Sequence, residues 1–188
     1  MHDVWQRIES QFRLQAPGRL SQLERGAKPE RIEEIERLVG RPLPDDFRRS
    51  YAIHDGAYGV PFGVYPDYLL SLEQIAGLLS WMREELIPPS PYRSEPVPVG
   101  PVRPIWWSEA WIPIVGEGTG DYLCIDLDPA EGGAVGQVFD WGHEYGPTRV
   151  LFPSFRGYLE RYAADLERGA IRYDEEDMHW VISDDPAV

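Results

Sequence analysis

Two stretches decide the fold: GTGDYLCIDLDP at residues 118–129 and GQVFDW at residues 136–141. Both are short runs of branched and aromatic residues bounded by glycines, a pattern typical of neighbouring β-strands. Side chains alternate between the two faces of a strand. The alternation places Leu123, Ile125 and Leu127 on one face, against Tyr122, Cys124, Asp126 and Asp128 on the other. We therefore predict paired strands with one core face and one partly solvated face that carries the aspartates.

Helical patterns lie on both sides of this strand region. Apolar residues recur at helical spacing within residues 4–12, 32–39, 47–51, 75–86 and 155–166. Local signals mark several helix ends: Pro29 at a first turn, Gly40 as a left-handed stop, Ser71 and Gln74 as a capping box, and Ser154 as an N-cap. Helices, then a meander of strands, then a helix favour an α+β fold with a central, mostly antiparallel sheet and helices packed on it.

The chain length of 188 residues is near that of one domain, and we assign residues 1–188 to a single unit. Residues 88–104 hold seven of the 18 prolines and show no periodicity, so we predict a long surface loop there. An acidic tail follows at residues 170–188. Within it, residues 178–182 have the composition of a strand, which we expect to add to the edge of the sheet.

The net charge is strongly negative, at −14, from 32 acidic and 18 basic residues. Such a surface repels phosphate backbones and attracts basic partners, so we expect a protein partner and no direct nucleic-acid contact. The single cysteine permits no internal disulfide, and the chain shows neither a signal-peptide pattern nor an apolar run of roughly 20 residues. We therefore expect a cytoplasmic protein without membrane contact.

The aspartates invite a metal-binding interpretation, with Glu117, Asp121, Asp126 and Asp128 as ligands. However, on a strand Asp126 and Asp128 lie about 6 to 7 Å apart, at about 3.3 Å per residue, and no loop supplies the converging oxygens of a calcium site. We interpret the acids as solvated carboxylates, and we predict no metal and no cofactor, because phosphate-binding and dinucleotide motifs are absent.

Carboxylates beside tryptophans also suggest a carbohydrate-active enzyme. The tryptophans concerned are Trp106, Trp107, Trp111 and Trp141. Buried tryptophans are more often core anchors, and we give this function the lowest rank. The pair His54 and Asp55 suggests a base with an orienting acid, but adjacent residues are poorly placed for that, and we predict no catalytic residue. Cys124 lies within a strand without a nearby cation, so we expect it to be inert.

A series of motifs, in order, resembles the SUKH superfamily over residues 20–166: Ile32-Glu-Glu-Ile-Glu, Gly40-Arg-Pro-Leu-Pro-Asp-Asp-Phe-Arg-Arg-Ser-Tyr51, His54-Asp-Gly56, Leu70-Ser-Leu-Glu-Gln-Ile75, Trp111-Ile-Pro-Ile-Val-Gly116, Gly120-Asp121, Asp126-Leu-Asp-Pro129, Gly136-Gln-Val138 and Ser154-Phe155. That superfamily includes fungal regulators of cell-wall synthesis and bacterial immunity proteins that neutralise toxins, often nucleases, by direct binding. The resemblance implies an α+β domain without catalytic residues. The first helix, the proline-rich loop and the acidic tail are additions to it.

We therefore predict a protein-binding domain, with toxin immunity as the leading hypothesis and a basic toxin domain as the partner. The partner-binding residues expected from the sequence are Asp121, Asp126, Asp128, Asp140 and Trp141, with the proline-rich loop as a rim. The alternative is a regulatory adaptor in cell-wall or stress physiology.

Overall fold

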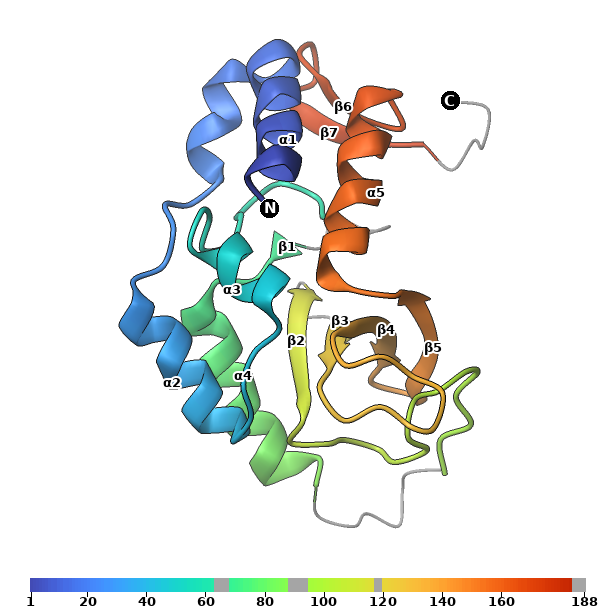
Figure 1. Ribbon diagram of the computed structural model, residues 1–188. Coiled ribbons are helices and arrows are strands. Elements are labelled where there is room, and N and C mark those ends of the chain that lie inside the picture. Colours follow the sequence, from blue (N-terminus) through green and yellow to red (C-terminus); the bar gives the residue numbers. More distant parts are fainter. Residues whose placement is uncertain (63–67, 88–94, 117–119, 184–188) are drawn as a thin grey trace.

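The computed structural model describes residues 1–62, 68–87, 95–116 and 120–183, and its path is shown in Figure 1. The chain begins with α1 (His2–Gln15), whose buried side chains are Val4, Trp5, Ile8 and Phe12, as the helical spacing predicts. A short 3-10 helix, η1 (Pro17–Gln22), follows. The buried stripe on α1 gives this helix a face that must pack against the rest of the domain.

The next two helices begin and end where proline and glycine predict. Helix α2 (Pro29–Val39) has Pro29 in its first turn and ends at Gly40, whose φ of 66° is easily adopted by glycine. Helix α3 (Asp45–Tyr51) follows the extended link at Pro44 and buries Phe47, Ser50 and Tyr51. The indole Nε1 of Trp5 donates a 2.8 Å hydrogen bond to Ser50 Oγ, which ties α1 to α3.

The two remaining helices have side-chain caps at their starts. Helix α4 (Leu72–Glu85) begins with the predicted capping box, in which Ser71 and Gln74 exchange hydrogen bonds. Helix α5 (Phe155–Glu167) begins at Ser154, whose Oγ accepts a hydrogen bond from the backbone N–H of Gly157. These caps satisfy backbone donors that have no partner within the helix.

Five strands form the main sheet in sequence order: β1 (Tyr68–Leu69), β2 (Trp111–Gly116), β3 (Tyr122–Asp126), β4 (Gln137–Gly142) and β5 (Gly146–Phe152). Every neighbouring pair is antiparallel. Helix α4 lies beside β2, and α2 packs against α4 (Figure 1). Helix α5 contacts β4 and β5, and α1 packs along α5. The predicted α+β fold is confirmed.

The prediction of a solvated face on β3 is wrong. Cys124 and Asp126 on the predicted wet face are both 0% exposed, and Ile125 on the opposite face is also buried. The face of β3 that was predicted to be solvated is covered by residues 95–110, which include the described part of the proline-rich loop. The carbonyl oxygens of Pro101 and Trp106 accept hydrogen bonds from Gln137 and Trp141 on β4. Residues 95–104 of the predicted surface loop therefore help to close the core, and residues 88–94 lie outside the described part.

The acidic tail forms a hairpin over much of its length. Strands β6 (Ile171–Asp174) and β7 (His179–Ile182) pair with each other in a separate two-stranded sheet. The expected strand therefore exists, but it does not join the edge of the main sheet. Instead, the ring of Trp180 packs 4.9 Å from that of Phe12 on α1. Among the described residues, no helix is long and apolar enough to cross a membrane.

Candidate binding surface

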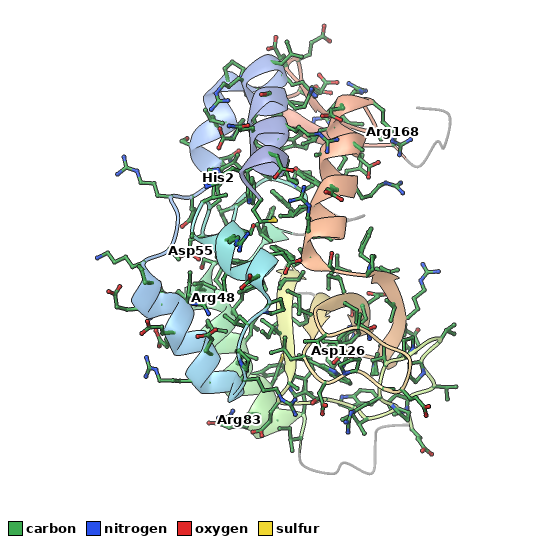
Figure 2. The ribbon with its side chains drawn as sticks, in the orientation of Figure 1. His2, Arg48, Asp55, Arg83, Asp126 and Arg168 are labelled. Carbon is green, nitrogen blue, oxygen red and sulfur yellow. The ribbon has the colours of Figure 1, made fainter. Side chains whose placement is uncertain are left out.

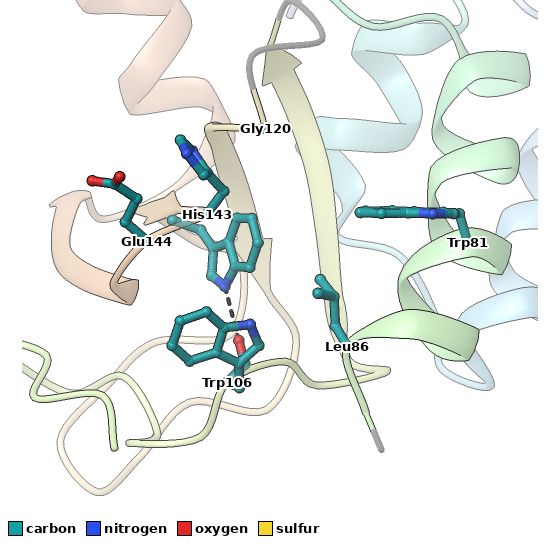
Figure 3. A pocket seen from close by; sticks show the side chains of 7 residues that line it. Trp81, Leu86, Trp106, Gly120, His143 and Glu144 are labelled. Atoms are coloured by element: carbon teal, nitrogen blue, oxygen red, sulfur yellow. Dashed lines mark hydrogen bonds between the residues drawn. The ribbon is translucent and has the colours of Figure 1, made fainter. Parts of the chain in front are cut away.

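A hollow of about 470 Å³ opens between α4 and the adjoining ends of β3 and β4 (Figure 3). Three of its lining side chains are tryptophans, and we call it the aromatic hollow. Its lining consists of Trp81, Leu86, Trp106, Gly120, Trp141, His143 and Glu144. Figure 3 shows Trp81 reaching from α4 on one side, with His143 and Glu144 on the opposite side. A concave surface of this size suits a side chain or short segment of a partner.

The floor of the aromatic hollow is rigid. Trp141 lies near the end of β4, and its indole Nε1 donates a 2.8 Å hydrogen bond to the carbonyl oxygen of Trp106. Trp107 packs edge-on against both Trp111 and Trp141, at centroid distances of 5.7 and 5.5 Å. Edge-to-face packing holds aromatic rings in fixed orientations. Trp107, Trp111 and Trp141 are at most 5% exposed, so they are core anchors, as the sequence indicated, and offer no open face to a sugar.

Trp81 is the exception among these tryptophans, because 49% of it is exposed. It lies on α4 just before Met82, which is fully buried, and so it stands beside the apolar stripe. The end of α4 is fixed by Arg83, which forms a 2.7 Å ion pair with Glu109 and donates a hydrogen bond to the carbonyl oxygen of Leu38. A large indole is therefore held open to solvent on a fixed helix.

The far rim of the hollow is polar. One carboxylate oxygen of Asp121 accepts a 2.9 Å hydrogen bond from the backbone N–H of His143 and lies 2.8 Å from its Nδ1. Gly120 has φ +95°, and a Cβ there would lie 3.0 Å from the Cβ of His143. Glycine at this position therefore lets the histidine approach. Next to it, a hydrogen bond to Glu144 raises the pKa of the exposed Tyr145.

Asp126, predicted to contact a partner, lies inside the domain among the strands (Figure 2). One of its oxygens accepts hydrogen bonds from Trp111 Nε1 at 3.1 Å and from the backbone N–H of Asp128 at 2.9 Å. The other accepts a 3.1 Å hydrogen bond from Gln137 Nε2. Burial raises the pKa of Asp126, and these hydrogen bonds to the carboxylate oppose that rise. Asp126 is thus a structural acid that joins three neighbouring strands, and it is removed from the candidate surface.

The remaining predicted residues do not form one cluster. Asp128 is engaged by Arg103 at 3.0 Å and by Arg41 at 3.3 Å, beyond the end of β3. Asp140 accepts a 3.0 Å hydrogen bond from the hydroxyl of Thr148 on β5. Asp121 lies at the opposite end of β3 from Asp126, roughly 16 Å away along the strand at 3.3 Å per residue. Of the five predicted residues, only Trp141 lines the hollow, as part of its buried floor, and Asp121 lies beside the hollow through its contact with His143.

The other candidates for chemistry have structural partners. His54 Nε2 lies 3.0 Å from Glu9 Oε1, and its Nδ1 lies 2.8 Å from the carbonyl oxygen of Glu24. Asp55 instead accepts a hydrogen bond from Leu72 N at the start of α4. Burial raises the pKa of the Cys124 thiol well above its ordinary value, which suppresses the thiolate. Within the described residues, no group of three or more His, Cys, Asp or Glu is placed to hold a metal ion, and Glu117 lies outside them.

Sequence reasoning missed Trp81. The signal was available, because a tryptophan beside the apolar stripe of an amphipathic helix is a large apolar side chain without a place in the core. The stripe on α4 is Leu72, Ile75, Leu79 and Met82. The residues that line the hollow with Trp81 come from segments far apart in the chain, and no local pattern predicts that they meet.

Comparison with known proteins places this chain in a family. The model of the SMI1 / KNR4 family (SUKH-1) matches residues 26–161. Similar proteins include the glucan synthesis regulatory protein of Neurospora crassa, 26% identical over 92% of this chain and 39% of that protein. Another is the cell wall biosynthesis/cell cycle regulator smi1 of Schizosaccharomyces pombe, 28% identical over 93% of this chain and 38% of that protein. The chain thus spans about two-fifths of the length of these relatives.

Proposed function

We propose that this chain, which belongs to the SMI1 / KNR4 family (SUKH-1), is a regulatory domain that binds another protein and acts in cell-wall synthesis. The relatives named above are regulators of glucan synthesis and cell-wall biosynthesis. The relatives are longer than this chain. On this proposal, the domain corresponds to the partner-binding part of such a regulator. On this proposal the domain itself catalyses no reaction.

The observation that carries the proposal is the exposed Trp81 above the rigid floor of the aromatic hollow. Binding hot spots are typically aromatic side chains held in well-packed surroundings and ringed by polar groups. Trp106 and Trp141 form the packed floor of the hollow that Trp81 borders, and His143, held by Asp121, supplies part of the polar rim. A rigid surface loses little conformational entropy on binding.

Charge gives the second line of support. The net charge of −14 would speed encounter with a basic partner and repel nucleic acid. The same charge, together with the resemblance to a superfamily that includes immunity proteins, supports the toxin-immunity hypothesis drawn from the sequence. Regulation of cell-wall synthesis therefore ranks first, because the named relatives support it, and immunity against a basic toxin ranks second.

The test begins with the intact chain as bait, cross-linked in extracts of its source organism. Partners are identified by mass spectrometry and their affinities are then measured with purified proteins. We expect Trp81→Ala to weaken binding at least tenfold, in the range of a hot-spot truncation. Leu14→Ala, which removes another exposed apolar side chain from a different helix, should leave the affinity unchanged.

The two functions are separated by the partner and by the phenotype. On the regulatory proposal, cells in which Trp81→Ala replaces the wild-type gene become sensitive to wall-digesting enzymes. A partner that is a toxin, with wall integrity unaffected by the variant, would favour immunity instead. Full affinity of Trp81→Ala for every partner would remove the aromatic hollow from the proposal.

A further inference from the structure

The aromatic hollow combines indole rings with negative charge. Among the residues that the structure describes, its lining includes Glu144 and His143 but no lysine or arginine. His143, the lining residue able to carry positive charge, is already in contact with Asp121 at 2.8 Å. Arg83, on the neighbouring turn of α4, is paired with Glu109. The uncompensated charge at the hollow is therefore negative.

The helix side of the hollow has the same character. Glu84 is exposed and follows Trp81 by three residues, so the two side chains share one side of α4. Trp81 thus has a carboxylate beside it, and Glu144 lies across the hollow (Figure 3). Indole faces attract cations through the ring quadrupole, and nearby carboxylates add to that attraction.

From this chemistry we propose that the aromatic hollow binds an arginine side chain presented by a segment of the partner protein. The proposal rests on the proposed function and names the chemistry that the same surface recognises. The guanidinium is planar, stacks on aromatic rings and is more weakly hydrated than the ammonium of lysine, so it can stack on the exposed indole of Trp81 at lower desolvation cost. Its N–H groups can donate to a carboxylate at the rim while its face contacts Trp81.

A purely apolar anchor is the competing occupant of the hollow. A leucine or phenylalanine side chain would contact Trp81 and Leu86 equally well, but it would strip water from Glu144 without offering a donor. Glu144 accepts a hydrogen bond from Tyr145, and loss of its remaining water without a further donor is unfavourable. Charge complementarity therefore selects the cation over the apolar side chain.

Three short peptides test the proposal directly: acetyl-Gly-Arg-Gly-amide, the same peptide with citrulline, and the same peptide with leucine. Citrulline keeps the shape of arginine and removes its charge. Each is titrated into ¹⁵N-labelled protein while the indole N–H signals of Trp81 and Trp106 are followed by NMR. We expect the arginine peptide to shift these signals and to bind at least about fivefold more tightly than the other two, as a cation–π contact predicts.

Variants of the intact chain sharpen the test. Glu144→Gln and Trp81→Ala should each weaken binding of the arginine peptide by at least about threefold. Glu131→Gln is the matched control, because Glu131 is an exposed acid in the link between β3 and β4, at the opposite end of β3 from the hollow. Raising the salt concentration should weaken binding of the arginine peptide and leave binding of the leucine peptide unchanged.

Equal binding of the arginine and citrulline peptides overturns the proposal, as does the absence of any shift in the two indole signals. The proposed function is judged separately, with the captured protein partner. If Trp81→Ala lowers the affinity for that partner and Glu144→Gln does not, the binding surface is supported and the arginine assignment is wrong. If neither variant changes the affinity for the partner, the proposed surface itself is wrong.

Discussion

Tyr122 occupies the space that a side chain on Gly116 would fill. The two residues are paired across β3 and β2, and a Cβ on Gly116 would lie only 2.4 Å from Cδ1 of the tyrosine ring. Contacts under 3 Å do not occur for real Cβ atoms. A glycine in this strand therefore lets the ring lie against the neighbouring backbone, next to Trp141.

Gly116→Ala should lower the free energy of unfolding by about 1–3 kcal/mol, because the tyrosine ring must move out of a packed position. Gly77→Ala is the control, since Gly77 lies in α4 with open space at its Cβ. That change should raise stability by about 0.5–1 kcal/mol through helix propensity. Urea unfolding of both variants provides the measurement, and equal stabilities would contradict the packing argument.

Asp126→Ala should be strongly destabilising, because it leaves the N–H groups of Trp111 and Asp128 buried without their acceptor. We expect a loss of about 1–3 kcal/mol for each unsatisfied donor. Asp128→Ala, two residues away, removes partly exposed ion pairs with Arg41 and Arg103 and should lose less than about 1 kcal/mol. Chemical denaturation at pH 7 compares them, and similar losses would show that the buried network contributes little.

The pH dependence of stability should carry the signature of Asp126. Burial raises its folded pKa above the ordinary value of 3.8, so the native state holds the proton more tightly than the unfolded chain. The contribution to the free energy of unfolding therefore falls as pH rises from 3.8 to the raised pKa, and it is constant above that. Asp126→Asn removes this titration. Subtracting its stability profile from that of the wild type should give a downward step in that window, whereas a flat difference contradicts the pKa shift.

Phe12 and Trp180 should be energetically coupled, because their rings pack 4.9 Å apart between α1 and β7. Phe12→Ala alone should lose about 3–5 kcal/mol, as expected for a fully buried phenylalanine. A double-mutant cycle with Trp180→Ala should give a coupling of about 0.5–1.5 kcal/mol. Leu14→Ala on the exposed side of α1 serves as the control and should not couple to Trp180. Strict additivity of the first pair would show that the hairpin does not hold the helix.

Cys124 should react with thiol reagents only when the domain unfolds. Its side chain is 0% exposed, and burial raises the pKa of its thiol. Labelling with Ellman's reagent should therefore be slow in native buffer and complete in urea, with a denaturant dependence that follows global unfolding. Rapid labelling under native conditions would reveal local opening of β3.

The sequence predicts this fold where the signals are local. Pro29, Gly40 and Ser71 act within one helical turn, and each marks the helix end that the structure shows. The burial of Asp126 could not be read in the same way, because the groups that cover it come from residues 95–110 and from β4. A segment without periodicity gives no sign that its carbonyl groups will accept hydrogen bonds from a distant strand.

The candidate surface was less predictable than the fold. Alternation along β3 predicts which acids share a face of the sheet. Whether that face is exposed to solvent depends on residues 95–110, which pack over it. Tyr122 and Trp141 are cross-strand partners, so the neighbouring Asp121 lies near the end of β4 that carries Trp141. Trp81 was overlooked because it reaches the same hollow from a helix, through tertiary packing alone.

The contact between α1 and the C-terminal hairpin also has a consequence for biogenesis. Helix α1 leaves the ribosome before α5 and β7, both of which pack against it in the folded domain. At 5–20 residues per second, translation delivers Trp180 roughly 10 to 30 seconds after Phe12. During that interval the apolar stripe of α1 lacks these packing partners, and exposed apolar segments of this kind are bound by chaperones.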